Sequence, residues 1–236
     1  MLRSNLEIVK AKIEQACKRA GRDPGEVTLV CVTKGIEAEK IKEVINLGIS
    51  DIGENRVQEA VAKYNELSLD FTRGKQTTKW HMVGHLQRNK VKDAVKLFNL
   101  IHSIDSLGLA QVINRGAAKI GKTQEILIEV NTSGEPTKFG IAAENTLALT
   151  REILKLGNLK FRGLMTVAPF VDNPEKARPY FKILRELRNR LSQQLAISHK
   201  LLALSMGMSQ DFEVAIEEGA TMVRIGTAIF KPTNFH

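Results

Sequence analysis

Val27-Thr-Leu-Val-Cys-Val-Thr33 is an uncharged run, rich in β-branched residues, near the start of the chain. A second run, Thr221–Ile225, is nearly uncharged and lies near the end. Such runs are typical of strands buried on both faces of a parallel sheet. An open sheet would have edge strands, which usually carry charge or proline. The two runs therefore favour a closed sheet in which the first and last strands are neighbours.

Between these two runs, short apolar segments alternate with longer amphipathic ones. The candidate strands are Val27–Thr33, Ser50–Ile52, Trp80–Gly84, Leu100–Ile104, Glu125–Asn131, Lys160–Val167, Lys200–Ser205 and Thr221–Ile225. A helical stretch follows each of them, and Leu2–Ala20 precedes them as an extra amphipathic helix. This order predicts an α/β fold, with residues 1–236 forming a single (β/α)₈ barrel domain. The rival is an open doubly wound sheet, but no Gly-x-Gly-x-x-Gly turn follows the first strand.

Basic residues outnumber acidic ones, 35 Lys and Arg against 26 Asp and Glu, for a formal net charge of +9. This balance suits either nucleic-acid binding or a general surface charge. The densest basic stretch, residues 88–96, has no arginine-rich tail or interleaved aromatic residues, so nucleic-acid binding is not expected. The charged first 20 residues exclude a signal-peptide core, and no run approaches the length of a membrane span. We therefore expect a cytoplasmic protein without membrane segments.

Neither the cysteines nor the histidines form a metal-binding pattern. Cys17 and Cys31 lack metal-type spacing, and Cys31 is expected to be a small buried hydrophobe because it lies inside an apolar run. His81 and His85 would lie about 13 Å apart on a strand, too far for one ion to join them directly. No metal site is expected.

Lys34 ends the first uncharged run. In a barrel the carboxyl ends of the strands form the active-site face. A lysine there can be partly desolvated, which lowers its pKa and frees the amine as a nucleophile for an aldehyde. The plainer interpretation is a lysine that marks where the strand leaves the core for water. This residue alone does not decide between the two.

Arg224 interrupts the apolar last run, and a buried arginine is costly unless it is paired or hydrogen-bonded. In a closed barrel it would lie near Lys34, lower the lysine pKa further and suit an anionic ligand. Gly226-Thr227 and the turn Ser205-Met-Gly-Met-Ser209 follow the last two predicted strands, where phosphate sites recur in this barrel type. Together these residues describe a pocket for a phosphorylated aldehyde.

Two further segments have open interpretations. Asn55 follows the second predicted strand and is expected either to hydrogen-bond a ligand at the pocket rim or to cap the next helix. The segment Ser68–Thr78 is the only long irregular connection and is a candidate mobile loop.

Several longer motifs resemble the pyridoxal phosphate homeostasis proteins, once labelled proline synthetase co-transcribed homologues. The motifs are Val32-Thr-Lys-Gly35, Gly53-Glu-Asn-Arg-Val-Gln-Glu-Ala60, Trp80-His-Met-Val-Gly-His-Leu-Gln-Arg-Asn-Lys-Val-Lys92, Ile101-His-Ser-Ile-Asp105, Arg162-Gly-Leu-Met-Thr166, Leu204-Ser-Met-Gly-Met-Ser-Gln-Asp-Phe-Glu213 and Gly219-Ala-Thr-Met-Val-Arg-Ile-Gly-Thr-Ala-Ile-Phe230. The resemblance covers roughly residues 27–230.

The resemblance implies a barrel like the N-terminal domain of alanine racemase, with pyridoxal 5′-phosphate (PLP) as cofactor. It implies a Schiff base between PLP and Lys34, with Arg224 facing the pyridine nitrogen. The other positions that match cofactor contacts in the family are Ser205, Gly226 and Thr227 around the phosphate, and Asn55 and Met206 lining the pocket. The family's role is described as maintaining vitamin B6 and amino-acid balance, without an established reaction.

Three functions remain open at this stage: a PLP carrier, a racemase- or lyase-type enzyme, and a basic interaction protein. Only six residues follow Phe230, so no second domain is expected to supply another catalytic residue or a dimer contact. The two tyrosines, Tyr64 and Tyr180, lie in helix-like segments. We therefore expect a monomeric carrier that serves PLP-dependent apo-enzymes.

Overall fold

The computed structural model of the chain describes residues 1–71, 78–198 and 202–231. Most of the candidate mobile loop, Ser68–Thr78, lies outside these residues: helix α3 ends at Phe71, and the description resumes at Thr78. Ser68–Phe71, predicted to be irregular, belong to helix α3, and for residues 72–77 the prediction of a mobile loop stays a prediction.

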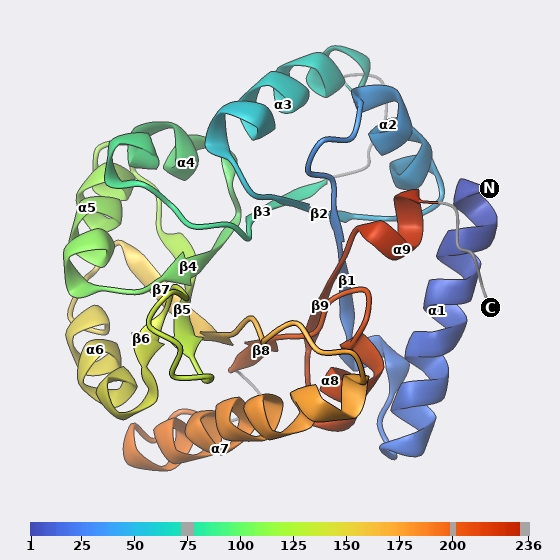
Figure 1. Cartoon of the computed structure of the whole chain (residues 1–236). Coiled ribbons are helices and arrows are strands. Elements are labelled where there is room, and N and C mark those ends of the chain that lie inside the picture. Colours follow the sequence, from blue (N-terminus) through green and yellow to red (C-terminus); the bar gives the residue numbers. More distant parts are fainter. Residues whose placement is uncertain (72–77, 199–201, 232–236) are drawn as a thin grey trace.

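The strands form a closed barrel in which every pair is parallel (Figure 1). They are β1 (Thr28–Val32), β2 (Asp51–Glu54), β3 (Lys79–Met82), β4 (Leu100–Ile104), β5 (Gln124–Asn131), β6 (Ile141–Ala142), β7 (Leu159–Met165), β8 (Ala203–Ser205) and β9 (Met222–Ile225). Strand β1 pairs with both β2 and β9, and β4 pairs with β5, which closes the ring. The predicted barrel is confirmed and the open sheet is excluded. All eight predicted strands are found, although Lys200 and Leu201 of the predicted seventh strand lie outside the described residues. The two-residue β6, which pairs with β5, was not predicted.

Helices surround the barrel on the outside (Figure 1). They are α1 (Leu2–Arg19), α2 (Ala38–Asn46), α3 (Val57–Phe71), α4 (Val91–Leu97), α5 (Leu107–Ala118), α6 (Thr146–Ile153), α7 (Arg178–Gln194), α8 (Phe212–Glu217) and α9 (Thr227–Phe230). Short 3₁₀ turns span Pro24–Glu26, Arg88–Lys90, Ala143–Asn145 and Pro174–Ala177. Helix α1 is the predicted extra helix, and it packs against α8 and α9.

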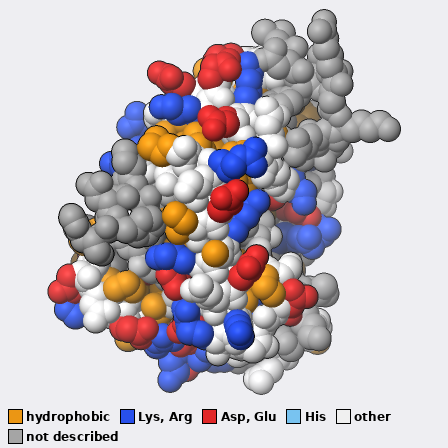
Figure 2. Space-filling view, turned by 90° about the vertical axis from the view of Figure 1, so that its right-hand side faces the viewer, with side chains coloured by type: hydrophobic (Ala, Val, Ile, Leu, Met, Phe, Trp, Pro, Cys, Tyr) orange, Lys and Arg blue, Asp and Glu red, His pale blue; other side chains and the backbone are white. Residues whose placement is uncertain are grey.

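The buried Asn5 of α1 attaches this helix to the end of the barrel. Its amide donates to the carbonyls of Ile229 and Lys231, each at 3.0 Å. On the face where α1 lies, basic and acidic side chains are interspersed, with no continuous basic patch (Figure 2). Ion pairs between α1 and α8 are part of this pattern, including Arg19 with Glu213 and with Glu217. This face therefore lacks the basic stripe expected of a nucleic-acid interface.

The barrel has two cores with different chemistry. The large outer cluster, between sheet and helices, takes up every second strand residue, such as Cys31, Val223 and Ile225. The inner cluster is small and contains Leu100, Leu127 and Met165. Because side chains alternate along a strand, Arg224 shares the inner face with Met222 and not with its apolar neighbours. Polar groups therefore fill much of the barrel interior.

Cys31 is buried, as predicted, and Cys17 is buried as well; both are free thiols. Burial raises the pKa of the Cys31 thiol to about 12. Within the part of the chain that the structure describes, no helix combines the length and apolar character needed to cross a bilayer.

Candidate functional site

Lys34 lies just beyond the carboxyl end of β1, in the turn that leads to α2. The side chain is exposed. Of the two interpretations left open by the sequence, the structure agrees with the lysine that marks where the strand leaves the core, because β1 ends at Val32 and the lysine lies beyond it. No described residue forms a hydrogen bond or ion pair with its amine. The amine is thus available to a ligand.

The backbone on both sides of Lys34 is held by a buried charge cluster. Lys63 of α3 donates to the Thr33 carbonyl at 2.6 Å, to Glu54 Oε1 at 2.7 Å and to Glu59 Oε1 at 2.6 Å. Glu59 accepts from the Gly35 amide at 2.6 Å, and the Thr33 hydroxyl donates to Glu54. The backbone is therefore fixed at Thr33 and Gly35, while the side chain between them contacts no polar partner in the described part of the chain.

Sequence reasoning missed this cluster. A signal was present, because Ala60, Lys63 and Leu67 lie at helical spacing and all three are buried. A lysine on the apolar stripe of a helix requires a partner. Its partner Glu54 is completely buried, and burial raises the pKa of that carboxyl while Lys63 and Thr33 oppose the rise.

Arg224 is 4% exposed and projects into the barrel from β9. It donates to Ser205 Oγ at 2.7 Å and to the Thr166 carbonyl at 2.8 Å. Burial lowers the pKa of the guanidinium to about 10, although Glu129 and Asp211 oppose the change. The remaining N–H groups of the guanidinium are still available to another acceptor.

The closing seam brings the strands of Lys34 and Arg224 together, as expected, but at different depths. Arg224 is level with Val30 on β1, and Lys34 lies four residues further along, about 13 Å for an extended chain. The arginine therefore lies below the lysine inside the barrel, and the two cations are not side by side. A ligand between them would reach from the rim into the interior.

The turns after β8 and β9 meet at the rim next to Lys34. A Cβ on Gly226 would lie 2.8 Å from the Val32 carbonyl oxygen, so this close approach requires glycine. Thr227 is exposed and begins α9. Ser209 Oγ accepts from the Ala228 amide at 3.2 Å and links the two turns. Backbone amides and hydroxyls that suit an anion thus gather at this rim.

Ser205 and Met206 lie deeper than this rim. The Ser205 hydroxyl is completely buried and contacts both Arg224 and His102. Met206 is also completely buried, within the outer core. Ser209, which is half-buried, is the hydroxyl that this turn presents at the rim. Sequence reasoning noted the turn but did not place Ser209 among the site residues.

Asn55 lies at the carboxyl end of β2, half-buried at the same rim. A Cβ on Gly84 would collide with the backbone of Asn55, so the segments that follow β2 and β3 are tightly packed there. Its amide has no hydrogen-bond partner among the described residues, and no cap on α3 is formed by it. This leaves the predicted ligand role open.

The two histidines considered as a metal pair point to different places. His81 lies inside the barrel beside Asp51 and His102. His85 lies 3.7 Å from Asp105 and stacks on Phe139. In residues 1–71, 78–198 and 202–231, no three His, Cys, Asp or Glu side chains group as metal ligands.

Comparison with known proteins identifies the family. The model of the alanine racemase N-terminal domain family matches residues 4–234. A curated protein of Aquifex aeolicus, named pyridoxal phosphate homeostasis protein, is 47% identical over 95% of this chain and 95% of its own. This chain belongs to the pyridoxal phosphate homeostasis protein family.

Solved structures agree with that family and with its fold. The family member PipY of Synechococcus elongatus, solved with PLP bound, is 32% identical and superposes with a TM-score of 0.82 over 98% of this chain and 100% of its own. Alanine racemase of Clostridium difficile has a TM-score of 0.72 at 18% identity and covers 99% of this chain but 57% of its own. The second likeness shows the fold alone. The resemblance of this chain to the pyridoxal phosphate homeostasis proteins is thus confirmed.

Proposed function

We propose that this chain binds PLP in the carboxyl-end mouth of the barrel and holds it as a Schiff base on Lys34. Its role is to keep, buffer and pass on the cofactor, and so to maintain vitamin B6 and amino-acid balance. A PLP-bound family member and the name of the Aquifex relative support this assignment.

One observation carries the proposal: Lys34, whose amine has no partner among the described residues, lies four residues beyond the level of the buried Arg224 on the strand pair that closes the barrel. A nucleophilic amine is what a carbonyl requires, and a buried donor suits a ring nitrogen. The amides of Gly226 and Thr227 and the hydroxyl of Ser209 lie at the same rim, where a phosphate would find donors. The donor set therefore fits the cofactor.

Each residue of the chain has a separate task in this proposal. PLP supplies an electrophilic carbonyl and an electron-withdrawing ring when bound. Lys34 supplies the amine, and the cluster around Lys63 keeps its backbone in place. Arg224 can donate to the pyridine nitrogen but cannot accept a proton from it. Ser205 positions Arg224, while its predicted contact with the phosphate and the pocket roles of Asn55 and Met206 stay predictions.

The structure favours a carrier over a racemase- or lyase-type enzyme. Such an enzyme needs an acid or base placed opposite the lysine. Tyr64 packs edge-on against Trp80 from α3, and Tyr180 lies in α7, so both tyrosines are outside the barrel. We also propose that the chain acts as one cytoplasmic domain and as a monomer, which passes PLP to apo-enzymes through the open rim.

Borohydride trapping tests the Schiff base. Purified protein is reduced, digested and analysed by mass spectrometry. The expected result is the reduced cofactor mass on Lys34, lost in Lys34→Ala and kept in the control Lys40→Ala, whose lysine is exposed on α2. A label on another lysine, or no label, would refute the proposal. Incubation with amino acids in deuterated water separates carrier from enzyme: rapid multiple-turnover exchange of the α-proton would identify an enzyme.

A further inference from the structure

A continuous chain of buried hydrogen bonds crosses the barrel interior from Arg224 to Asp51. Arg224 donates to Ser205 Oγ at 2.7 Å, and Ser205 Oγ lies 2.9 Å from His102 Nδ1. His102 Nε2 lies 2.9 Å from His81 Nδ1, and His81 Nε2 lies 3.0 Å from Asp51 Oδ1. The five side chains come from five strands, and none is more than 8% exposed.

The hydrogens in this chain take one arrangement while both histidines are neutral and the Asp51 carboxyl is ionised. A carboxylate only accepts, so His81 carries its proton on Nε2 and donates to Asp51. His81 Nδ1 then accepts from His102, which carries its proton on Nε2. His102 Nδ1 is left as an acceptor, and the Ser205 hydroxyl donates to it while its oxygen accepts from Arg224. Every bond therefore points the same way, from a cation to an anion.

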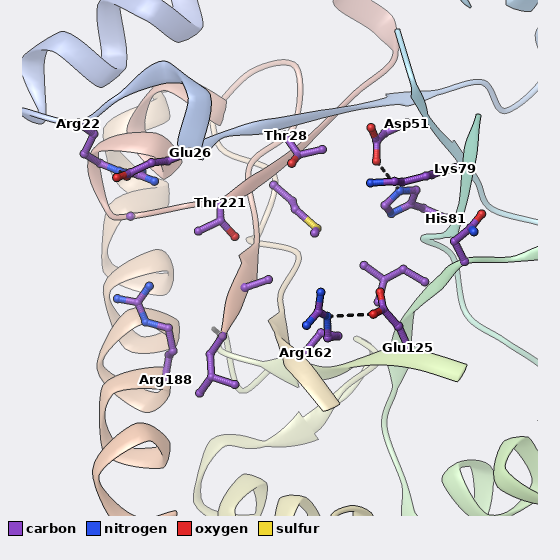
Figure 3. A pocket seen from close by; sticks show the side chains of 16 residues that line it. Arg22, Glu26, Thr28, Asp51, Lys79, His81, Glu125, Arg162, Arg188 and Thr221 are labelled. Atoms are coloured by element: carbon purple, nitrogen blue, oxygen red, sulfur yellow. Dashed lines mark hydrogen bonds and ion pairs between the residues drawn. The ribbon is translucent and has the colours of Figure 1, made fainter. Parts of the chain in front are cut away.

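The two ends of the chain face different surroundings. Arg224 lies beneath the proposed cofactor mouth, whereas Asp51 and His81 line a cavity of about 850 Å³ at the amino ends of the strands (Figure 3). Hydrogen bonds from His81 and Ser50 lower the pKa of the Asp51 carboxyl, although burial opposes the change. Protons from solvent can thus reach His81 through the cavity, on the side away from the cofactor.

A proton added to His81 would rearrange the whole chain. His81 would carry hydrogens on both nitrogens, so His102 Nε2 must become the acceptor. The proton of His102 then sits on Nδ1 and donates to Ser205 Oγ, and the Ser205 hydrogen turns away. Ser205 Oγ now accepts from His102 as well as from Arg224, and an extra positive charge lies in the same core. Both changes weaken the hold on Arg224.

We propose that the chain from Asp51 to Ser205 is a proton-linked positioning device for Arg224, so that protonation at the cavity on the amino-terminal face loosens the cofactor in the opposite mouth. Asp51, His81, His102 and Ser205 are positioning residues that act through Arg224. The proposal rests on the proposed function, because it assigns a control to the same cofactor site. Cofactor retention then falls when His81 gains a proton.

Other charged groups face the chain and must be separated from it. Around His81 they are Lys79 on its own strand, Glu125 of β5 and Arg162 of β7, with Arg22, Glu26 and Arg188 further along the same cavity wall (Figure 3). Glu129 and Asp211 act on Arg224, and the Glu129 carboxyl has a pKa that burial raises to about 7. A test must therefore change the protonation of His81 without altering the charged groups around Arg224.

Histidine ring NMR tests the chain without any cofactor. In ¹⁵N-labelled apo-protein near neutral pH, both His81 and His102 are expected as the Nε2–H tautomer. On acidification His81 gains a proton and His102 changes to the Nδ1–H tautomer at the same midpoint. Either histidine in the other tautomer at neutral pH, or independent midpoints for the two rings, would refute the proposed chain.

Cofactor retention against pH tests the coupling. In Asp51→Asn the anion that stabilises protonated His81 is removed, so retention should persist to a pH about one unit lower than in wild type. If Asp51 had only a structural role, Asp51→Asn would weaken PLP retention at every pH and would not lower the pH at which PLP is lost. Two control variants should lose PLP at the same pH as wild type: Asp93→Asn, at an exposed position of α4, and His85→Gln. An unshifted midpoint in Asp51→Asn refutes the coupling.

Ser205→Ala cuts the chain between the histidines and Arg224. The NMR changes of His81 and His102 should persist in this variant. In the Ser205→Ala background, adding Asp51→Asn should no longer change the pH at which PLP is lost. A difference that survives would refute transmission through Ser205. If wild type never binds PLP on Lys34, the proposed function fails by itself, and the NMR result still decides whether the chain exists.

Discussion

Gly226 and Val32 lie so close across the seam between β9 and β1 that a Cβ on the glycine would sit 2.8 Å from the Val32 carbonyl oxygen. Strand β1 leads to Lys34, and β9 carries Arg224, so this contact sets the spacing of the two residues that the proposed cofactor joins. The seam is therefore both the closure of the fold and the frame of the site.

Gly226→Ala is expected to push the seam apart. Crowding a packed site costs about 1–3 kcal/mol of unfolding free energy, and retention of PLP should also fall. Gly157→Ala is the matched control, because a Cβ there meets no atom within 4 Å. Urea unfolding and absorbance of dialysed protein measure the two effects. Wild-type stability and retention in Gly226→Ala would contradict the proposed geometry.

Arg224→Lys keeps a positive charge but loses the planar pair of donors. A lysine cannot bond Ser205, the Thr166 carbonyl and a ring nitrogen in the same geometry. We expect PLP retention to fall by about tenfold or more, in line with the loss of a charge-assisted bond, with a shifted absorbance band. Absorbance spectra of dialysed protein measure PLP retention and the band position. Arg151→Lys, at an exposed position of α6, is the control. An unchanged spectrum and affinity would remove Arg224 from the site.

Lys63→Met leaves the carboxylate of Glu54 buried without its cationic partner. Breaking a buried pair in this way costs about 3–5 kcal/mol near neutral pH. The pKa of the Glu54 carboxyl, already raised by burial, rises further, so the carboxyl protonates on acidification and the loss shrinks as pH falls. The exposed pair of Lys155 with Glu152 provides the control, since Lys155→Met should cost less than about 1 kcal/mol. A loss that does not vary with pH would argue against an ionised Glu54.

Glu129→Gln should change how stability depends on pH. Burial raises the pKa of this carboxyl from 4.5 to about 7, so its ionisation costs the folded state free energy. The cost starts above pH 4.5 and is complete above pH 7, and it reaches up to about 3 kcal/mol. Removing the carboxyl should therefore stabilise apo-protein more at pH 8 than at pH 5. Urea unfolding at both values checks this, with exposed Glu186→Gln as a control that shows no such difference. Equal effects at both pH values would contradict it.

Local pattern was sufficient for most of the fold and for part of the site. Apolar runs bounded by helical stretches predicted all eight barrel strands, because buried parallel strands need continuous apolar sequence. Lys34 was found because it ends such a run, and Arg224 because it interrupts one. Whether Lys34 would be buried or exposed was left open, since the position where β1 stops depends on its pairing with β2 and β9.

The sequence by itself determined the order of strands and helices, the family, and the residue types at the rim. Only the tertiary structure decided the buried chain from Asp51 through His81, His102 and Ser205 to Arg224, and the cluster of Lys63 with Glu54. For the chain from Asp51 to Arg224, the physical reason is that a polar residue alternating with apolar ones along a strand is predicted to face water. When the sheet closes, that face becomes the interior of the barrel, and residues from distant strands become partners.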